Sequence, residues 1–257
     1  QEESIWLHKN EGQWHSNVLY QVDLNGGKMY VEPTGFTYHF IENPRKDHHS
    51  TTVAPTSIEV ESLNQHVVRS KFIGSSWQQQ KVENKISNFY RNYYIGTDKQ
   101  QWASKVRSYE QVILNDLYPG IDLQLDGEKA QLKYAFIVTP NSNANSIRWE
   151  IEGAKDIQLM DNGSLTIKTT LGEINESKPI AWTIKNGVKQ PVQVKYRLKN
   201  KIVQFDFPHS YNNQDTLVID PYLVFSTYTG ASSDNWGMTA TPGPNGEMLA
   251  GGIVFGA

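Results

Sequence analysis

The sequence contains no cysteine, which excludes a disulfide framework, a thiolate nucleophile and a cysteine-ligated zinc site. It also has no long apolar run, since its longest ones are a few residues and a membrane-spanning helix needs about 18. The 24 Lys and Arg against 27 Asp and Glu leave a net charge of −3. General nucleic-acid binding therefore lacks the excess of positive charge that drives it.

Familiar catalytic motifs are missing as well. The sequence has no GxSxG nucleophile elbow, no Walker loop and no GxGxxG dinucleotide fingerprint. Its glycine-rich C-terminal stretch lacks the strand-then-helix context that phosphate binding requires. These absences disfavour nucleophilic and phosphoryl-transfer enzymes, so we expect no catalytic residues and no cofactor.

The composition that remains is typical of a globular protein. Hydrophobic residues make up 38% of the 257 residues and charged residues 20%, so a packed core can form. A chain of this length fits one large all-β domain, or one domain with part of another. The N-terminal Gln1-Glu2-Glu3-Ser4 has neither an initiator Met nor a charged-then-apolar leader. We interpret it as a processed end, which predicts an exported protein.

Hydrophobic alternation with a period of two recurs along most of the chain and predicts antiparallel strands joined by hairpins. Turn residues separate the alternating runs at Pro33-Thr34-Gly35, Asp126-Gly127, Asp161-Asn162-Gly163, Asn186-Gly187 and Lys199-Asn200. Asn and Gly accept the positive φ that tight hairpins need. The sequence therefore predicts an all-β fold with a large antiparallel β-sandwich-like domain, rich in hairpins, over about residues 1–220.

Residues 97–125 are predicted to form the structural centre of this domain. Thr97-Asp98 can cap a short helix of at most two turns, and strand-like residues follow from Tyr109. Apolar positions with strand spacing recur across the turn at residues 118–122. We expect four side chains to be buried here: Trp102, Tyr109, Tyr118 and Ile121.

The character of the chain changes from Leu217 onward, where LVIDPYLVFSTYTG is strongly apolar and a glycine-rich stretch follows. We expect a boundary near residues 221–225, and therefore a second segment over residues 221–257. Alternating apolar positions in that segment predict a few strands with unpaired edges. Its own domain or a partner chain is expected to cover them.

Several sequence motifs occur in an order that resembles a known family. The motifs are NEGQW (10–14), GGKMYVEPTGFTYHF (26–40), NYYIG (92–96), Trp102, YPGIDLQL (118–125), LKYAFIV (132–138), GSLTIKTTLGEINESKP (163–179) and IDPYLVFSTYTG (219–230). Together they resemble the N-terminal domain of large surface proteins of Bacteroidota. In that family the domain typically precedes β-propeller-type repeats, often followed by a C-terminal sorting domain linked with gliding motility and type IX secretion.

The resemblance implies a location and a class of role. It implies an exported module, at the cell surface or extracellular, with no established chemistry and no catalytic residues to assign. It also implies that residues 221–257 are the first strands of a truncated β-propeller-type repeat. A blade needs about 40 residues and a propeller at least four blades, so these residues cannot close a propeller.

Polar clusters have both functional and structural interpretations. His48 and His49, after Asp47, could bind zinc or nickel. Adjacent side chains on an extended chain point to opposite sides, however, so the two imidazoles would not face one ion. The polar segment 43–55, with Pro near both ends, favours a solvated loop instead. Two acidic pairs, Asp122 with Asp126 and Glu173 with Glu176, could serve a glycosidase, although local hydrogen bonding explains the first pair. Calcium could bind at Asp234-Asn235 or at Asp161-Asn162-Gly163, where a turn is favoured. We predict no metal site.

Two further residues are candidates for surface functions. The seven Trp are mostly expected in the core, and Trp77, next to Ser75, Ser76 and a Gln run, is the best candidate for an exposed aromatic that stacks on a ligand. Asp215-Thr216-Leu217 resembles the O-glycosylation sequon of Bacteroidota, which marks Thr216 as a possible modification site.

Two hypotheses about function follow. The first is a non-enzymatic, adhesin-like module of the outer-membrane surface that caps or positions a repeat array, contacts other domains of its own chain, and supports adhesion, gliding or attachment to an outer-membrane or secretion-system protein. The second is a carbohydrate-binding or carbohydrate-degrading module, whose partner is a glycan. A sugar site requires a concave surface with convergent aromatics and free polar groups, whereas a cap presents a flat apolar face.

Overall fold

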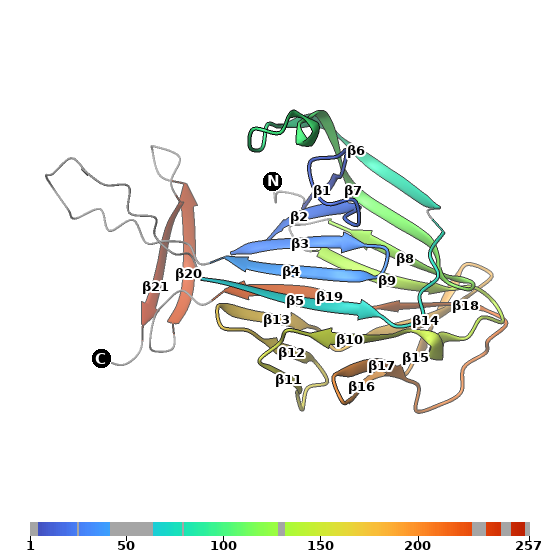
Figure 1. The fold of residues 1–257 in the computed structure, drawn as a ribbon. Helices are drawn as coiled ribbons and strands as arrows, with labels where there is room; N and C mark the ends of the chain where they lie inside the picture. Colours follow the sequence, from blue (N-terminus) through green and yellow to red (C-terminus); the bar gives the residue numbers. More distant parts are fainter. Residues whose placement is uncertain are drawn as a thin grey trace, which may run out of the picture. The chain divides into compact units, whose positions relative to one another are not determined.

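The computed structural model describes residues 5–24, 26–41, 64–78, 80–127, 132–227, 235–242 and 248–254. The structure is nearly all β, as predicted, and its strands pair antiparallel (Figure 1). It divides into two compact units, residues 1–226 and residues 227–257. No helix in the described part of the chain combines the length and apolar character needed to cross a membrane.

The first layer of unit 1 is a run of eight neighbouring strands. In spatial order they are β1 (Leu7–Lys9), β2 (Tyr20–Leu24), β3 (Gly27–Glu32), β4 (Gly35–Ile41), β5 (Gln65–Phe72), β10 (Arg148–Glu152), β17 (Ile202–Asp206) and β16 (Lys195–Lys199). Strands close in sequence form the first half of the layer. The second half joins segments far apart in sequence, such as β5 and β10.

The second layer begins at β7 (Ala103–Tyr118), which pairs with β1 in its middle and therefore links the layers. It continues through β8 (Ile121–Asp126), β9 (Leu132–Val138), β18 (Thr216–Asp220), β14 (Ile180–Lys185) and β15 (Val188–Val192). The strands β11 (Asp156–Leu159), β12 (Leu165–Lys168) and β13 (Gly172–Glu176) form a meander, which β19 (Tyr222–Thr227) connects to β9. On its other edge, β7 pairs with β6 (Lys81–Tyr93).

The core lies between the inner faces of these layers. Phe36 of β4 packs edge-on against Tyr134 of β9, and Phe72 of β5 packs against Phe136 of β9. Trp149 of β10 stacks on Phe136 with 6.5 Å between ring centroids. These aromatic contacts between layers bury large apolar areas and produce the sandwich-like packing.

Residues with positive φ form the tight turns of the hairpins, as the sequence predicted. Asn186 and Gly187 both have positive φ, which suits the two-residue turn joining β14 to β15. Between β16 and β17 the two positive-φ residues are Asn200 and Lys201, one position later than predicted. Lys199 instead pairs with Ile202 as the last residue of its strand.

Three of the four residues predicted to be buried in segment 97–125 are in the core: Tyr109, Tyr118 and Ile121. The prediction for Trp102 is wrong, because its side chain is 39% exposed. Trp102 directly follows the short 3-10 helix η1 (Lys99–Gln101), where the chain turns from β6 into β7 and the side chain lies at the surface. The predicted cap is present, since the Asp98 carboxylate accepts a hydrogen bond from the Gln100 backbone N–H.

Unit 2 contains a two-stranded antiparallel sheet of β20 (Asn235–Pro242) and β21 (Met248–Val254). Its register shifts between Gly237 and Thr239. Glycine and small residues are frequent in both strands.

Candidate functional site

The most exposed apolar surface of unit 1 lies on the hairpin of β6 and β7, residues 81–107, which we call the β6–β7 arm. Seven of the twelve exposed large apolar or aromatic side chains in the described structure belong to it: Val82, Ile86, Phe89, Tyr90, Tyr94, Ile95 and Trp102. Contiguous exposed apolar surface usually marks a contact site in a soluble protein. The arm is therefore the first candidate site.

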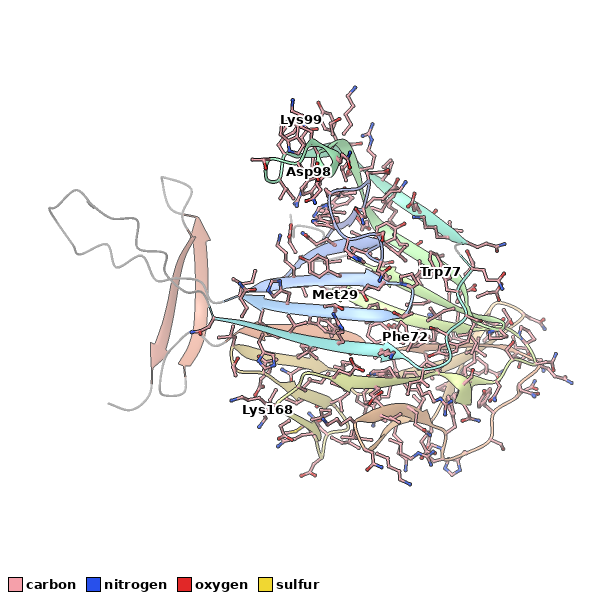
Figure 2. All side chains as sticks on the ribbon, viewed as in Figure 1. Met29, Phe72, Trp77, Asp98, Lys99 and Lys168 are labelled. Carbon is pink, nitrogen blue, oxygen red and sulfur yellow. The ribbon has the colours of Figure 1, made fainter. Side chains whose placement is uncertain are left out.

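The tip of the arm, residues 94–102, has a defined local structure (Figure 2). The Trp102 ring packs edge-on against Tyr94 with 5.4 Å between centroids, and the Lys99 ammonium lies 5.7 Å from the Trp102 ring centroid. The Trp102 indole N–H donates to the Gly96 carbonyl over 3.3 Å. Rings at the tip are thus positioned by the protein itself and still face solvent.

The base of the arm is fixed to the sandwich. Phe89 packs edge-on against Trp6, and Tyr93 against Trp14, each at 5.2 Å between centroids. Arg91 donates to the Asp23 carboxylate on β2 over 2.8 Å. Because these contacts come from three separate segments, the arm is held firmly to the sandwich at its base.

Beside the arm's base, the fold brings together a serine, a histidine and an aspartate. Ser108 Oγ lies 2.7 Å from His8 Nδ1, and His8 Nε2 lies 3.5 Å from Asp23 Oδ2. The hydrogen bond with His8 and the adjacent Arg91 guanidinium hold the pKa of Asp23 well below its usual range. Ser108 is fully enclosed, so a substrate cannot reach its hydroxyl. The cluster ties β1, β2 and β7 together, a structural role that sequence spacing could not reveal.

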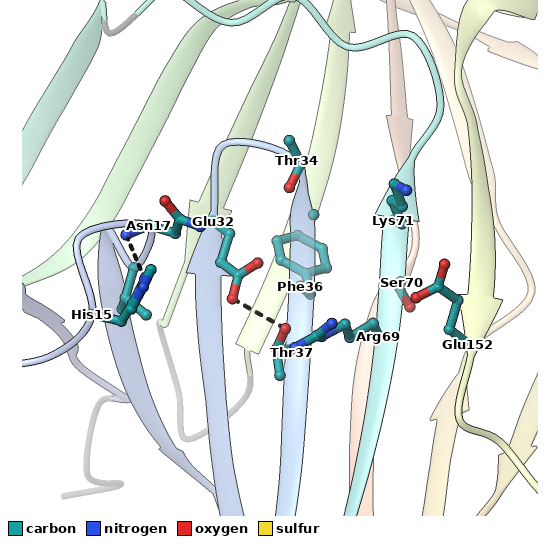
Figure 3. Close-up of a pocket in the computed structure, with 12 residues that line it drawn as sticks. His15, Asn17, Glu32, Thr34, Phe36, Thr37, Arg69, Ser70, Lys71 and Glu152 are labelled. Atoms are coloured by element: carbon teal, nitrogen blue, oxygen red, sulfur yellow. Dashed lines mark hydrogen bonds between the residues drawn. The ribbon is translucent and has the colours of Figure 1, made fainter.

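A polar groove of about 460 Å³ lies on the outer face of β3, β4, β5 and β10 (Figure 3). Its polar lining is His15, Asn17, Glu32, Thr34, Thr37, Arg69, Lys71 and Glu152. Thr37 Oγ1 donates to the Glu32 carboxylate over 3.2 Å, and Arg69 lies between Thr37 and Glu152 in the strand register. Donors and acceptors alternate along this groove, which suits a polar ligand with several hydroxyl groups.

A glycine forms part of this groove for a steric reason. Gly35 has φ of +146° and sits where β4 approaches β5 closely. A Cβ there would collide with the Ser70 carbonyl oxygen, so any other residue would push the two strands apart. The polar groove therefore depends on glycine at position 35.

A second groove, of about 350 Å³, lies on the outer face of β8, β9, β18, β14 and β15; we call it the Trp182 groove. Ala135, Ile137, Ile184 and Val218 line it together with charged side chains of Asp126, Lys133, Lys189 and Asp220. The Lys189 ammonium lies 4.0 Å from the Trp182 ring centroid, and the enclosed Trp182 indole N–H has no hydrogen-bond partner in the described structure. Burial raises the pKa of Asp220, while Lys133 and Lys189 oppose the shift.

The structure separates the predicted acidic pair of β13. Alternation along the strand places Glu173 on the outer side and Glu176 in the core. Glu176 accepts hydrogen bonds from the hydroxyls of Tyr134 over 2.8 Å and Tyr196 over 3.2 Å, and burial raises its pKa to about 7. The two carboxylates therefore do not face a common cleft. The position of Glu176 could have been predicted, because it follows Ile174 in the apolar phase of the strand.

The other predicted pair participates in local hydrogen bonds. Asp122 Oδ1 accepts from the Asp116 backbone N–H over 2.8 Å, and Asp126 Oδ2 accepts from Gln111 over 2.9 Å. At the possible calcium turn, Asn162 Oδ1 accepts from both the backbone and the hydroxyl of Ser164, as the turn interpretation predicts.

The remaining predicted sites are placed as follows. Trp77 is half-buried against the core, and its indole N–H donates to the Gln80 carbonyl over 2.9 Å. Thr216, the possible O-glycosylation site, is half-buried at the start of β18, opposite Ile184. His48, His49 and Asp234 lie outside the described residues. Within the described ranges, no three His, Asp or Glu side chains gather in a group suited to a metal ion.

Comparison with known proteins shows the family of the chain. Residues 7–222 match the profile of a family described as a domain of unknown function (DUF7948). No curated protein and no solved structure matches the chain.

Proposed function

Because this chain belongs to the DUF7948 family, whose function is unknown, we propose its function from its exposed surfaces. We propose that it is a non-enzymatic, exported cell-surface module of a large repeat protein of Bacteroidota, which supports adhesion, gliding or attachment to an outer-membrane partner. In this proposal the β6–β7 arm makes the contact.

The exposed aromatic surface of the arm carries the proposal. Leaving Tyr94, Ile95 and Trp102 in water has a free-energy cost that a binding partner would remove. Tyr, Trp and Arg are also the residues most often responsible for binding energy at protein interfaces. A base held by Arg91 and by aromatic contacts presents these side chains without a large ordering cost on binding.

The motif order supports the rest of the proposal. It resembles domains that precede propeller-type repeats in proteins linked with type IX secretion, so we propose that β20 and β21 are the first strands of such a repeat. Two strands with many small residues fit this proposal, since a two-stranded sheet is only marginally stable alone and a propeller blade has four strands.

Substitutions in the full-length protein of the source bacterium test the proposal. The double variant Tyr94→Ser/Ile95→Ser removes apolar surface from the tip, and Leu159→Ser/Met160→Ser is the matched control, since both residues are comparably exposed on the β11 side of unit 1. With equal surface display, measured by protease accessibility on intact cells, we expect the tip variant to lose attachment to a solid surface and the control to keep it. Unchanged attachment in the tip variant, or absence of the protein from the surface, would contradict the proposal.

The second candidate function is a carbohydrate-binding or carbohydrate-degrading module, which the two grooves favour. The polar groove aligns Arg69, Lys71 and Glu152, and the Trp182 groove combines an indole with carboxylates. Glycan-array binding by the purified chain, lost in Arg69→Ala or in Trp182→Ala, would support this candidate. Equal binding by both variants and the unaltered chain would exclude these grooves as the glycan site.

A further inference from the structure

We propose that the tip of the β6–β7 arm binds the interfacial region of an anionic lipid membrane. The inference rests on the proposed function, because it identifies the surface that the attachment arm contacts. Three properties of residues 94–107 lead to it: exposed interfacial side chains, an excess of positive charge and backbone hydrogen bonds formed within the tip.

The exposed side chains are of the kinds that occupy membrane interfaces. Tyr94 is 64% exposed, Ile95 45% and Trp102 39%. Tyr and Trp are enriched at the headgroup level of bilayers, where the ring is apolar and its polar atom stays hydrated. Phe89 and Tyr90 are also exposed, farther along the same arm.

The charge of the tip complements an anionic surface. Residues 94–107 contain three basic side chains, Lys99, Lys105 and Arg107, and one acidic side chain, Asp98, in a chain whose net charge is −3. Lys105 and Arg107 are exposed, and within the described structure neither makes an ion pair. Arg107 lies opposite Tyr90 in the strand register, which places a cation beside an exposed ring. Anionic headgroups attract such cations, and added salt weakens the attraction.

Several backbone groups at the tip are hydrogen-bonded within the tip itself. The Gln101 and Trp102 backbone N–H groups donate to the carbonyls of Asp98 and Lys99, and the Asp98 carboxylate accepts from Gln100. These internal hydrogen bonds lower the free-energy cost of moving the tip into the membrane interface, because an unpaired backbone N–H or C=O is unfavourable in an apolar medium. Among the strand pairings of the described residues, β6 pairs with β7, and its other edge is open (Figure 1). Insertion is therefore limited to the tip and to interfacial depth.

Vesicle co-sedimentation tests the inference with the whole 257-residue chain. We expect binding to vesicles of phosphatidylcholine with 30% phosphatidylglycerol, at least tenfold weaker binding to pure phosphatidylcholine, and loss of binding in high salt. We expect Tyr94→Ser/Ile95→Ser and Lys99→Gln/Lys105→Gln/Arg107→Gln each to reduce binding at least tenfold. The controls Leu159→Ser/Met160→Ser and Lys155→Gln/Lys178→Gln/Lys185→Gln change exposed residues elsewhere and should bind like the unaltered chain.

A spectroscopic measurement identifies the contact. Brominated acyl chains should quench part of the tryptophan fluorescence of the unaltered chain, and Trp102→Phe should remove that quenching while circular dichroism confirms an intact fold. Absence of vesicle binding, or binding that survives both tip variants, would overturn the inference. If vesicle binding is absent but the tip variant still loses attachment in cells, the proposed function stands and the partner of the arm is a protein.

Discussion

At the scale of single residues, Glu176 is a carboxylic acid built into an apolar core. Its neighbours Tyr134 and Tyr196 donate hydrogen bonds that favour the ionised form, but burial outweighs them and raises the pKa to about 7. The unfolded chain has no such burial, so its carboxyl ionises near pH 4.5. Folding therefore retains a proton on Glu176 between these two values.

This difference predicts a pH-dependent stability with a defined sign. Above pH 4.5 the unfolded state releases the proton while the folded state keeps it, so the contribution of Glu176 to the free energy of unfolding falls as pH rises and levels off above 7. The expected loss is about 3 kcal/mol. Urea unfolding at pH 4.5, 6 and 8 should show Glu176→Gln gaining stability relative to the unaltered chain as pH rises. Glu173→Gln, on the other face of β13, is the control, and a parallel profile for both variants would contradict the assignment.

The lowered pKa of Asp23 predicts a contribution to stability that changes with pH in the opposite direction, falling as the solution becomes acidic. His8 and Arg91 lower its folded pKa, so its stabilisation is present at neutral pH, begins to be lost as pH falls below the ordinary value of 3.8, and disappears below the folded pKa. Because the side chain is half exposed, solvent screening limits the effect, and Asp23→Asn should cost about 1 kcal/mol at pH 7. The difference between Asp23→Asn and the unaltered chain should narrow in urea unfolding below pH 3.8. A constant difference down to pH 2 would refute this role.

At the scale of elements, β7 shows how one strand can have two environments. In its second half it is flanked by β6 and β8, and Leu114, Leu117 and Tyr118 are buried. At its start it belongs to the arm, where the register with β6 shifts at two bulges and Lys105 has positive φ. The aromatic residue just before β7 therefore lies outside the core.

Two tryptophan truncations distinguish these environments. Trp149→Ala should destabilise the protein by about 3–5 kcal/mol, because Trp149 packs against Phe136, Tyr196 and Phe205. Trp102→Ala should cost less than about 1 kcal/mol, because surface substitutions away from the core have small effects. Thermal unfolding of both variants measures how much stability each substitution removes. Equal losses of stability in the two variants would show that Trp102 belongs to the folded core.

At the scale of the whole molecule, sequence alone predicts local structure better than assembly. The alternation Ile121, Leu123, Leu125 identifies β8 and its inner face, and Asn186-Gly187 identifies a hairpin. The pairing of β5 with β10 joins residues about eighty positions apart, and no local pattern specifies it. The contact of Ser108 with His8 spans 100 positions for the same reason. Grooves on outer faces arise from such long-range pairing, so their residues could not be selected from the sequence.

Exposure of the arm is the other property that the sequence did not predict. A run such as Phe89, Tyr90, Tyr94 and Trp102 has the composition of a core, and core packing is the usual fate of such residues. The structure instead leaves these side chains exposed on the β6–β7 arm. That placement is the basis of our account, in which the arm attaches the molecule to its surroundings.

Photo-cross-linking in living cells of the source organism tests this central claim most directly. A photoreactive residue is placed at position 94 of the full-length protein in one strain and at position 159, which is also exposed, in another. Our account predicts that irradiation joins position 94 to lipid or to another envelope protein, and that position 159 yields much less product at equal expression. Equal cross-linking from both positions, or none from position 94, would contradict it.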